Sequence, residues 1–483
     1  MENIYLSNQI TLIITLIVGA FFVILAHLNS KKILNNKSHI VGDRNESIFS
    51  LTTSLSASAL GAWILFGPAS AATWGGIGAV IGYAIGTAAP MLFLFNFGPK
   101  IRKEHPKGMS LTEFVKRRFG TRILKMILIL ILFYLTIFLI AEVTAIAFLL
   151  NLISKTPLWV TSGLTLIICL LYVLRGGFKL SIITDKYQFI IIFGMILFSF
   201  FYILGNLEIS SYELIKKNSP NLLSKKYIPN YTAGLTFFIA VAATNLFHQG
   251  NWQRVFAAKN NIILKKSLIY SAIISFTIVL WMGYTGLISF SIDSEIKPDL
   301  AFFKLMFLDK NIFIIIFILI SALALTLSTI DTLINAISSL IIINGKEINK
   351  FLSGSEIKNR TNKIILLLSI LVFIFASKGL SILYLFLFAD LLCCAAVVTI
   401  FYGFFKKKIN IKLSFVSIIL GLISGLLFFP SQNFKSSLLV GKIIPVENFS
   451  QIISSNLLFV SFIVATIVPL IIITTHSLRN SLR

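Results

Sequence analysis

The chain has 483 residues, of which 57% are hydrophobic and 12% are charged. A soluble domain carries about 25% charged residues because its surface must be solvated, so this composition excludes a soluble globular protein. The net charge of +24 does not indicate a nucleic-acid partner, because the basic residues lie in the connections between long apolar runs.

Apolar runs of roughly 20 residues recur along the chain and predict membrane-spanning helices. Strands of a membrane barrel would be about ten residues long and alternating, so a barrel is excluded and an all-α polytopic membrane protein is expected. The first run has no preceding basic segment and no following small-residue cleavage site, so we interpret it as a span of the mature protein. Thirteen spans are predicted, at residues 7–28, 47–73, 75–98, 122–152, 157–174, 179–206, 230–249, 264–291, 312–343, 362–378, 380–404, 411–430 and 453–476.

The connections between these spans differ in charge on the two sides of the membrane. One side carries about 31 of the 42 lysines and arginines, including the dense run at 100–125, and the other about 11. The positive-inside rule then predicts a plasma or inner membrane protein with its N-terminus outside and its C-terminus in the cytoplasm. The longest connections, 207–229 and 430–452, are too short to fold alone. The sequence shows no phosphate-binding loop, catalytic triad or metal cluster, so we expect no enzyme activity, no cofactor and no obligatory protein partner.

Four carboxylates lie within predicted spans, namely Glu142, Asp185, Asp331 and Asp390. An ionisable residue at membrane depth costs a few kcal/mol, about 2.5–3.5 on insertion scales, and marks a functional site by default. No lysine or arginine is expected at the same depth, so the sequence predicts a cation from outside the chain as their partner. The alternative, that some are protonated or bonded to helix hydroxyls, stays open, above all for Asp390 and Glu142.

The middle of the second span is rich in small and hydroxylated residues, from Ser54 to Trp63, and the pair Gly67-Pro68 follows. Two interpretations are comparable. Small residues allow helices to pack closely in a membrane. A discontinuous helix would instead free backbone carbonyls that coordinate a cation.

The ninth span concentrates oxygen ligands, because Ser328, Asp331 and Thr332 share one helix face and Thr329 adjoins it. In one interpretation the serine and threonine hydroxyls only donate hydrogen bonds to carbonyls of their own helix and bind no ion. The carboxylate favours an ion site.

Three stretches of the chain form recognisable motifs. Residues 175–188 run from Arg175-Gly176-Gly177 to Thr184-Asp185 and Gln188. They resemble the Gly-Gly…Thr-Asp…Gln signature of the sodium:solute symporter family. Residues 251–259 are similar to its Trp-Gln-Arg…Ala-Ala-Lys loop, and residues 328–333 to its Ser-Ser-Leu-Asp-Ser-Ala stretch. The matches are in order and cover nearly the whole chain. They imply sodium-coupled uptake of a small organic solute by alternating access.

The resemblance also implies a LeuT-type fold, which is a 5+5 inverted repeat with one extra N-terminal and two extra C-terminal helices. An N-terminal helix and cytoplasmic loop would occupy 1–46, and the first repeat 47–206. An extracellular loop at 207–229 would lead to the second repeat at 230–404. Two C-terminal helices and a short cytoplasmic tail would complete the chain at 405–483.

Carried over by motif, the main sodium site of the family would comprise the carbonyls of Ala57, Leu60 and Leu325 and the hydroxyls of Ser328 and Thr329. Sodium is thus the one metal ion expected, as a coupling ion.

Some members have a second sodium site that uses the Asp of the Thr-Asp motif. We hypothesise that Asp185, Ser328, Asp331 and Thr332 form a second cation site here. Two adjacent carboxylates without a basic partner would otherwise repel, and one would hold a proton.

The solute itself is not defined by these motifs. The expected pocket walls are Trp63, Glu142, Thr244, Asn245 and Phe247. Glu142 would pair with the ammonium of an amino acid or polyamine, carry a proton, or be protonated and hydrogen-bonded. The apolar character of the seventh span disfavours a sugar, and a small nitrogen-containing compound is favoured.

One departure from the family pattern, one residue of a gate and two alternative functions complete the interpretation. Ala59 stands where proline transporters carry an Asp, which disfavours proline, and His248 is interpreted as a residue of the cytoplasmic gate. The alternatives are a proton-coupled symporter that uses Asp185, Asp331 and Glu142, and a membrane sensor derived from a transporter.

Overall fold

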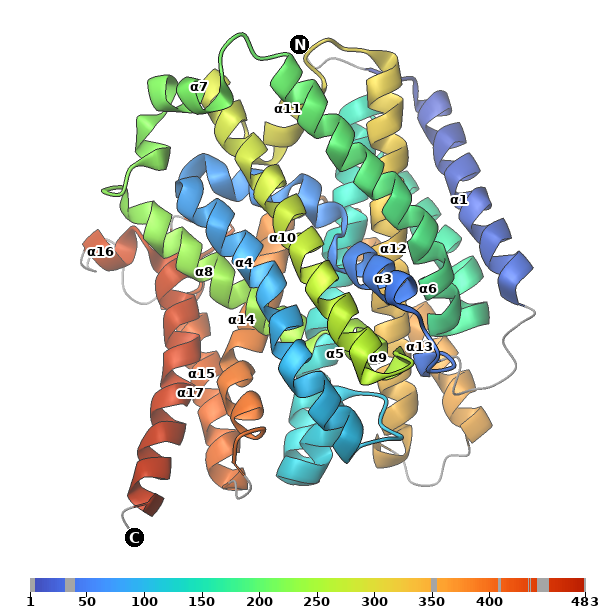
Figure 1. The fold of residues 1–483 in the computed structure, drawn as a ribbon, viewed down its shortest axis with the longest axis vertical. Coiled ribbons are helices and arrows are strands. Elements are labelled where there is room, and N and C mark those ends of the chain that lie inside the picture. Colours follow the sequence, from blue (N-terminus) through green and yellow to red (C-terminus); the bar gives the residue numbers. More distant parts are fainter. Residues whose placement is uncertain are drawn as a thin grey trace.

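The computed structural model describes residues 5–30, 40–348, 354–406, 410–432, 434, 436–440 and 451–481, and this part of the chain is a bundle of helices (Figure 1). Parts of four predicted connections lie outside the described residues, as do the last two residues of the predicted tail; these parts are residues 31–39, 349–353, 407–409 and, in the fourth connection, 433, 435 and 441–450. Apart from two isolated bridges, the described residues form no β-structure.

The helices follow one another along the chain with short connections. In the first half they are α1 (Asn8–Ser30), α3 (Ile48–Ala59), η1 (Ala62–Leu65), α4 (Gly67–Glu104), α5 (Leu111–Ser154), α6 (Leu158–Gly205), α7 (Ser211–Asn218) and η2 (Pro220–Leu223). In the second half they are α8 (Ile228–Phe247), α9 (Gln249–Ala257), α10 (Asn261–Ile292), η3 (Pro298–Leu300), α11 (Ala301–Met306), α12 (Ile312–Ile348), α13 (Gly354–Ala376), α14 (Ile382–Tyr402), α15 (Ile411–Phe428), α16 (Gln451–Ser454) and α17 (Leu457–Ser481).

Ten of the described helices are long and apolar enough to cross a membrane, and the shorter apolar segment Leu158–Val173 adds to them. The predicted spans at 157–174 and 179–206 are the two parts of α6, which turns at Gly177 with a φ of 55°. The count of thirteen stays a prediction.

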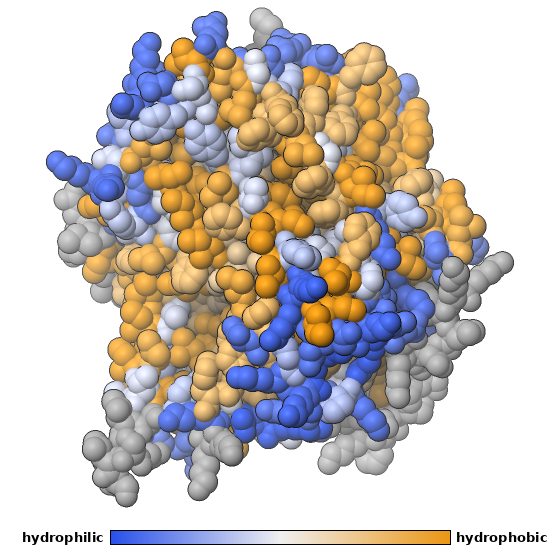
Figure 2. Space-filling view, in the orientation of Figure 1, coloured by the Kyte–Doolittle hydropathy of each residue, from blue (hydrophilic) through white to orange (hydrophobic). Residues whose placement is uncertain are grey.

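Large apolar side chains face outward from the bundle. Ile129, Phe201 and Leu367 are 68%, 70% and 67% exposed, an arrangement that water would not tolerate over so many helices. Apolar side chains cover the middle of the face in Figure 2, and hydrophilic ones gather toward its lower right. The outer surface of the bundle is therefore suited to lipid.

Two helices are broken inside the bundle. The helix α3 ends at Ala59. Leu60 and Gly61 are non-helical, and the helices η1 and α4 follow them. Of the two interpretations of the second span, the discontinuous helix is thus the one that the structure has. A second break separates α8 from α9 at His248, whose φ and ψ are −65° and 109°.

The helix α4 packs against its neighbours with backbone in contact with backbone. A Cβ atom on Gly78 would lie 1.7 Å from the carbonyl oxygen of Asn230, and one on Gly82 would lie 2.0 Å from that of Gly234 in α8. On the α10 side, a Cβ on Gly286 would lie 2.1 Å from the carbonyl oxygen of Ala69. Small residues at membrane helix interfaces permit this approach, and any side chain there would force the helices apart.

We therefore expect Gly82→Ala to destabilise the protein, because overpacking costs about 1–3 kcal/mol. Gly194→Ala on α6 is the matched control, since nothing lies within 4 Å of its would-be Cβ. Thermal unfolding in detergent should show a lower midpoint for Gly82→Ala than for Gly194→Ala. Equal midpoints would contradict the close approach of α4 and α8.

Candidate functional site

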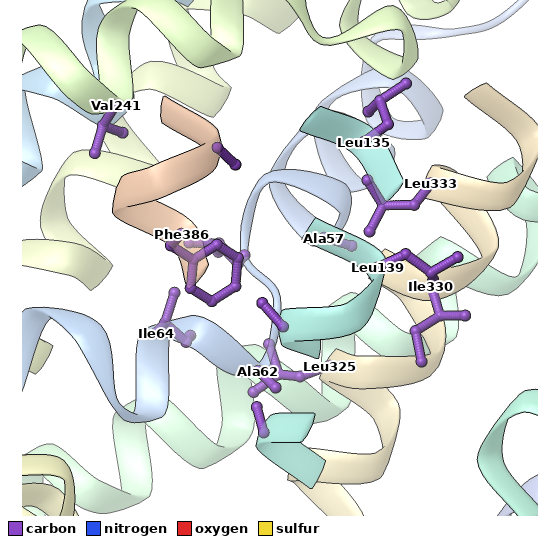
Figure 3. Packing of buried hydrophobic residues seen from close by; sticks show 14 of the residues in the cluster. Ala57, Ala62, Ile64, Leu135, Leu139, Val241, Leu325, Ile330, Leu333 and Phe386 are labelled. Carbon is purple, nitrogen blue, oxygen red and sulfur yellow. The ribbon is translucent and has the colours of Figure 1, made fainter. Parts of the chain in front are cut away.

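A small cavity of about 40 Å³, room for a few water molecules, lies where α3 is broken. Its walls come from both sides of that break and from α4, α5, α8, α12 and α14. The lining residues are Ser58, Ala59, Trp63, Tyr83, Phe138, Glu142, Val241, Asn245, His248, Thr329, Phe386 and Asp390. Figure 3 shows Ala62, Phe386 and Leu325 around this break, with the apolar side chains of α5 and α12 packed beside it. We call this space the central cavity.

The central cavity holds two buried carboxyl groups and, among the described residues that line it, no strongly basic side chain. Glu142 and Asp390 are 0% and 5% exposed, and none of the lining residues is a lysine or an arginine. The Glu142 Oε2 atom accepts a hydrogen bond of 2.8 Å from the backbone N–H of Ala62, a donor that the break in α3 frees. The Asp390 Oδ1 atom accepts one of 2.7 Å from the Thr244 hydroxyl.

The second oxygen of Glu142, the Oε1 atom, has no hydrogen-bond partner among the residues that the structure describes. A Cβ atom on Gly61 would lie 2.2 Å from this Oε1 atom, so it points at the non-helical link of α3. A buried polar atom without a partner costs about 1–3 kcal/mol, and a charged one costs more. Glu142 is therefore suited to a ligand that supplies a donor or a positive charge.

Aromatic rings form much of the remaining wall. Trp63 and Tyr83 stack with ring centroids 5.3 Å apart and planes at 12°. Phe138 and Phe386 meet edge to face at 4.9 Å. Ring faces attract organic cations by about 0.5–2 kcal/mol each, more when water is excluded. Carboxylates and rings together favour a cationic ligand.

The expected pocket residues are partly brought together. Trp63, Glu142 and Asn245 line the cavity, whereas Thr244 lies behind the wall and orients Asp390. Phe247 is not among the lining residues. It lies two residues after Asn245, about 200° around α8, and packs on Phe401 with centroids 5.5 Å apart.

His248 lines the central cavity and holds the second break in place, because its Nδ1 atom accepts a hydrogen bond of 3.1 Å from the Gly250 N–H and caps α9. Its role in a gate stays a prediction. No pattern in the sequence distinguished Tyr83, Phe138 or Phe386, since aromatic residues are common in every span. Asp390 was recognisable by its charge at membrane depth, but the sequence assigned it no role.

A buried ion pair lies beside this cavity. The Arg254 Nη2 atom is 2.9 Å from the Asp185 Oδ2 atom, and both side chains are 0% exposed. The expectation that no basic side chain reaches the depth of the carboxylates is therefore wrong. After the break at His248 the chain turns inward, and all nine residues of α9, expected to form a cytoplasmic connection, are buried.

Arg254 and Asp185 tie together four helices. Asp185 also accepts hydrogen bonds from Ser54 in α3 at 2.5 Å and from Ser328 in α12 at 2.7 Å. Arg254 donates to Ser54 at 2.8 Å and to Thr332 at 3.3 Å. Charge-assisted bonds of this kind are roughly twice as strong as neutral ones. The pair therefore fixes how α3, α6, α9 and α12 meet.

Asp331 joins the same cluster through hydroxyl groups. It accepts hydrogen bonds from Ser181 at 2.7 Å, Tyr172 at 3.1 Å and Thr332 at 3.3 Å. The four residues of the hypothesised second cation site are thus neighbours. Two carboxylates share one guanidinium among these side chains, which leaves one negative charge for a monovalent cation or a proton to balance.

Of the residues expected in the main sodium site, most lie at or near the break in α3, but Ser328 is directed elsewhere. Thr329 approaches the break in α3, since its hydroxyl would lie 2.8 Å from a Cβ on Gly61, and it donates to the Leu325 carbonyl of its own helix at 3.2 Å. The carbonyls of Ala57 and Leu60 lie at the end of α3, where helix carbonyls lack partners within the helix. Ser328 is turned toward Asp185 instead.

Known membrane transporters are similar to this chain in sequence and in fold. The profile of the sodium:solute symporter family matches residues 39–421. The spermidine transporter DUR31 of Candida albicans is 25% identical over 377 residues, which cover 77% of this chain and 70% of that protein.

Two solved structures show the same fold. A Na⁺-coupled sialic acid symporter, in a substrate-bound outward-open state, aligns over 96% of both chains with a TM-score of 0.73 and 18% identity. The second is Mhp1, a nucleobase-cation-symport-1 family transporter in a closed conformation with bromovinylhydantoin bound. It aligns over 91% of this chain and 95% of its own, with a TM-score of 0.53 and 14% identity. The LeuT-type fold expected from the sequence is confirmed.

We expect Arg254→Gln to destabilise the protein by about 3–5 kcal/mol, because removal of one partner leaves a buried charge uncompensated. The double variant Asp185→Asn/Arg254→Gln should recover part of this loss. Lys179→Gln, which breaks the exposed pair with Asp43, is the control and should cost about 0–1 kcal/mol. Thermal unfolding of the four proteins measures this order, and a double variant no better than Arg254→Gln would contradict it.

Proposed function

Because the chain belongs to the sodium:solute symporter family, we propose that it takes up a small organic amine by sodium-coupled symport. Membership of that family makes it a multi-pass membrane transporter and not an enzyme. The observation that carries the amine is the unpartnered Oε1 atom of buried Glu142, in a cavity that Asp390 and four aromatic rings also line.

An ammonium group matches this cavity chemically. It carries three donors and no acceptor, so it satisfies a carboxylate oxygen without leaving a lone pair facing another lone pair. A hydrogen bond to a charged group contributes about 1.5–3 kcal/mol. A sugar acid would instead place its own carboxylate beside Glu142 and Asp390, with no basic side chain among the lining residues. The substrate of the sialic acid symporter is therefore not transferred to this chain.

A linear amine with two or more charges fits the pair of carboxylates better than an amine with one. Glu142 belongs to α5 and Asp390 to α14, so the two lie on different helices of the cavity wall. The similarity to a spermidine transporter supports the same class, since spermidine is a chain of methylenes with three amines. We propose polyamines or diamines as the first substrates to test.

Sodium coupling would act through the broken helix. The proposed main site, with Ala57, Leu60, Leu325, Ser328 and Thr329, shares Thr329 with the lining of the central cavity. An ion bound there would fix the link whose Ala62 N–H orients Glu142. Sodium shifts the conformational equilibrium only if its affinity differs between the outward-open and inward-open states.

The membrane potential would drive both solutes inward. With the cytoplasm on the basic side, each positive charge that enters gains about 2.3 kcal/mol per 100 mV. A cationic amine could accumulate on that potential alone, so sodium dependence must be tested at a clamped potential. The cluster of Asp185 and Asp331 would hold a second cation, either Na⁺ or, in a proton-coupled version of the mechanism, a proton.

We expect Glu142→Gln to reduce amine uptake at least tenfold, because the neutral amide keeps the shape of the side chain and removes the charge. Glu113→Gln is the control on the same helix, since Gln also completes a capping box. The measurement is uptake into proteoliposomes of radiolabelled spermidine and putrescine beside amino acids, betaine, urea and short carboxylates, with Na⁺ or choline outside. Uptake confined to a neutral or anionic solute would reject the amine.

We expect Thr329→Ala to raise the half-saturating Na⁺ concentration for uptake about tenfold, because it removes one oxygen ligand beside the break. Thr326→Ala is the matched control, one turn earlier on α12, where the hydroxyl bonds only the Ala322 carbonyl. The uptake rate against Na⁺ concentration at a clamped potential distinguishes them. Identical curves would remove Thr329 from the sodium site.

We expect Asp331→Asn to weaken the cation dependence of uptake, because it removes the excess negative charge of the cluster. The number of Na⁺ ions that accompany each amine, from reversal potentials, should fall by one. Loss of a dependence on the pH gradient, with Na⁺ stoichiometry intact, would assign a proton to Asp331. Unchanged affinity, stoichiometry and pH dependence would exclude Asp331 from a cation site.

A further inference from the structure

A second, larger cavity opens on the side of the bundle that the charge distribution assigns to the outside. Its volume is about 390 Å³, against about 40 Å³ for the central cavity. It lies between the beginnings of α4, α8 and α14, the short helix η3 and the segment from α16 to α17. Figure 1 shows α16 beside α8 at the left of the bundle, which marks this region. We call it the outer cavity.

The outer cavity repeats the chemistry of the central one. Among the described residues that line it, Asp299 is the one ionisable group, and the rings of Trp74 and Phe434 lie in the same wall with several hydroxyl groups. Burial raises the pKa of Asp299 above the usual range of an aspartate, and a hydrogen bond from Ser70 opposes that rise. A half-buried carboxylate among aromatic rings, with no basic side chain among the described residues of the same wall, is again suited to an organic cation.

A row of aromatic rings connects the two cavities. Trp74 of the outer cavity lies 5.8 Å from Phe237, measured between centroids. Phe237 stacks on Tyr83 at 4.7 Å, and Tyr83 stacks on Trp63 at 5.3 Å, both in the wall of the central cavity. The rings thus run without a gap from one cavity to the other.

The helix α8 shows how near the cavities are. Thr236 lines the outer cavity and Val241 lines the central one. Five residues of helix correspond to about 7.5 Å along the axis. The wall between the cavities is therefore about one and a half helical turns thick, and the stacked pair of Phe237 and Tyr83 lies at that level.

We infer that the outer cavity is a second binding site for an organic ammonium ion, from which the amine passes along the aromatic row to Glu142 and Asp390. This inference rests on the proposed function. The outer site holds one half-buried carboxylate and the central site two buried ones, so the outer site binds more weakly. The cation exchanges water for ring faces step by step and meets its strongest electrostatic partners last.

The test is equilibrium binding of radiolabelled spermidine to the purified protein in lipid nanodiscs with saturating Na⁺. The unmodified protein should bind two molecules with affinities that differ at least tenfold. Asp299→Asn should lose the weaker site and retain the tighter one, and Glu142→Gln should do the reverse. Asp293→Asn is the matched control, because Asp293 lies in the same connection but pairs with Lys304 and does not line the cavity.

The kinetics give a second readout that a merely structural defect would not reproduce. In Asp299→Asn, uptake at low spermidine should fall several-fold, while the maximal rate and the thermal unfolding midpoint stay unchanged. One bound spermidine per protein, unaffected by Asp299→Asn, would overturn the inference and leave the proposed function intact. No binding of spermidine or any other amine to the unmodified protein would overturn both.

Discussion

The ion pair between Arg254 and Asp185 is the constraint around which the interior of this bundle is arranged. A guanidinium at zero exposure inside a membrane protein is tolerable only when a carboxylate and several oxygen acceptors surround it. Those partners come from helices far apart in the sequence, so the pair dictates where α3, α6 and α12 meet α9. It also depends on the break at His248, since α9, which carries Arg254, is buried along its whole length after that break.

The break in α3 serves the same interior in a different way. An intact helix would consume its backbone groups internally, whereas the interruption at Leu60 and Gly61 frees an N–H at Ala62 and carbonyls at the end of the helix. The freed donor orients Glu142, and the link at Gly61 lies beside the Thr329 hydroxyl of α12. The proposed ion site and the proposed substrate site share this short link of backbone. An ion that binds at the link would therefore act directly on the substrate site, and we propose this as the physical basis of coupling.

Charge and aromatic surface together give the two cavities a common selectivity. Each contains carboxylate and ring faces, and no lysine or arginine is among the described residues that line either one. Carboxylates alone would also attract inorganic cations, and rings alone would accept neutral apolar solutes. Their combination favours an organic cation, because cation–π attraction strengthens where water is excluded. The stacked pair of Tyr83 and Phe237 separates the cavities, so a cation that passes between them exchanges one ring face for the next.

The sequence by itself determined the class of fold, since apolar runs, positive-inside charge and three family motifs each follow from local composition and order. It also located the carboxylates, because a charge at membrane depth is costly wherever it lies. Only the tertiary structure decided their partners. The sequence predicts that Arg254 lies in a loop, whereas the structure places it in the buried helix α9, after the break at His248. The sequence predicts that Phe247 lines the pocket, whereas in the structure it packs on Phe401. Hydropathy reports how deep a residue lies, whereas helix breaks and rotation decide what it faces, and these depend on contacts between segments far apart in the chain.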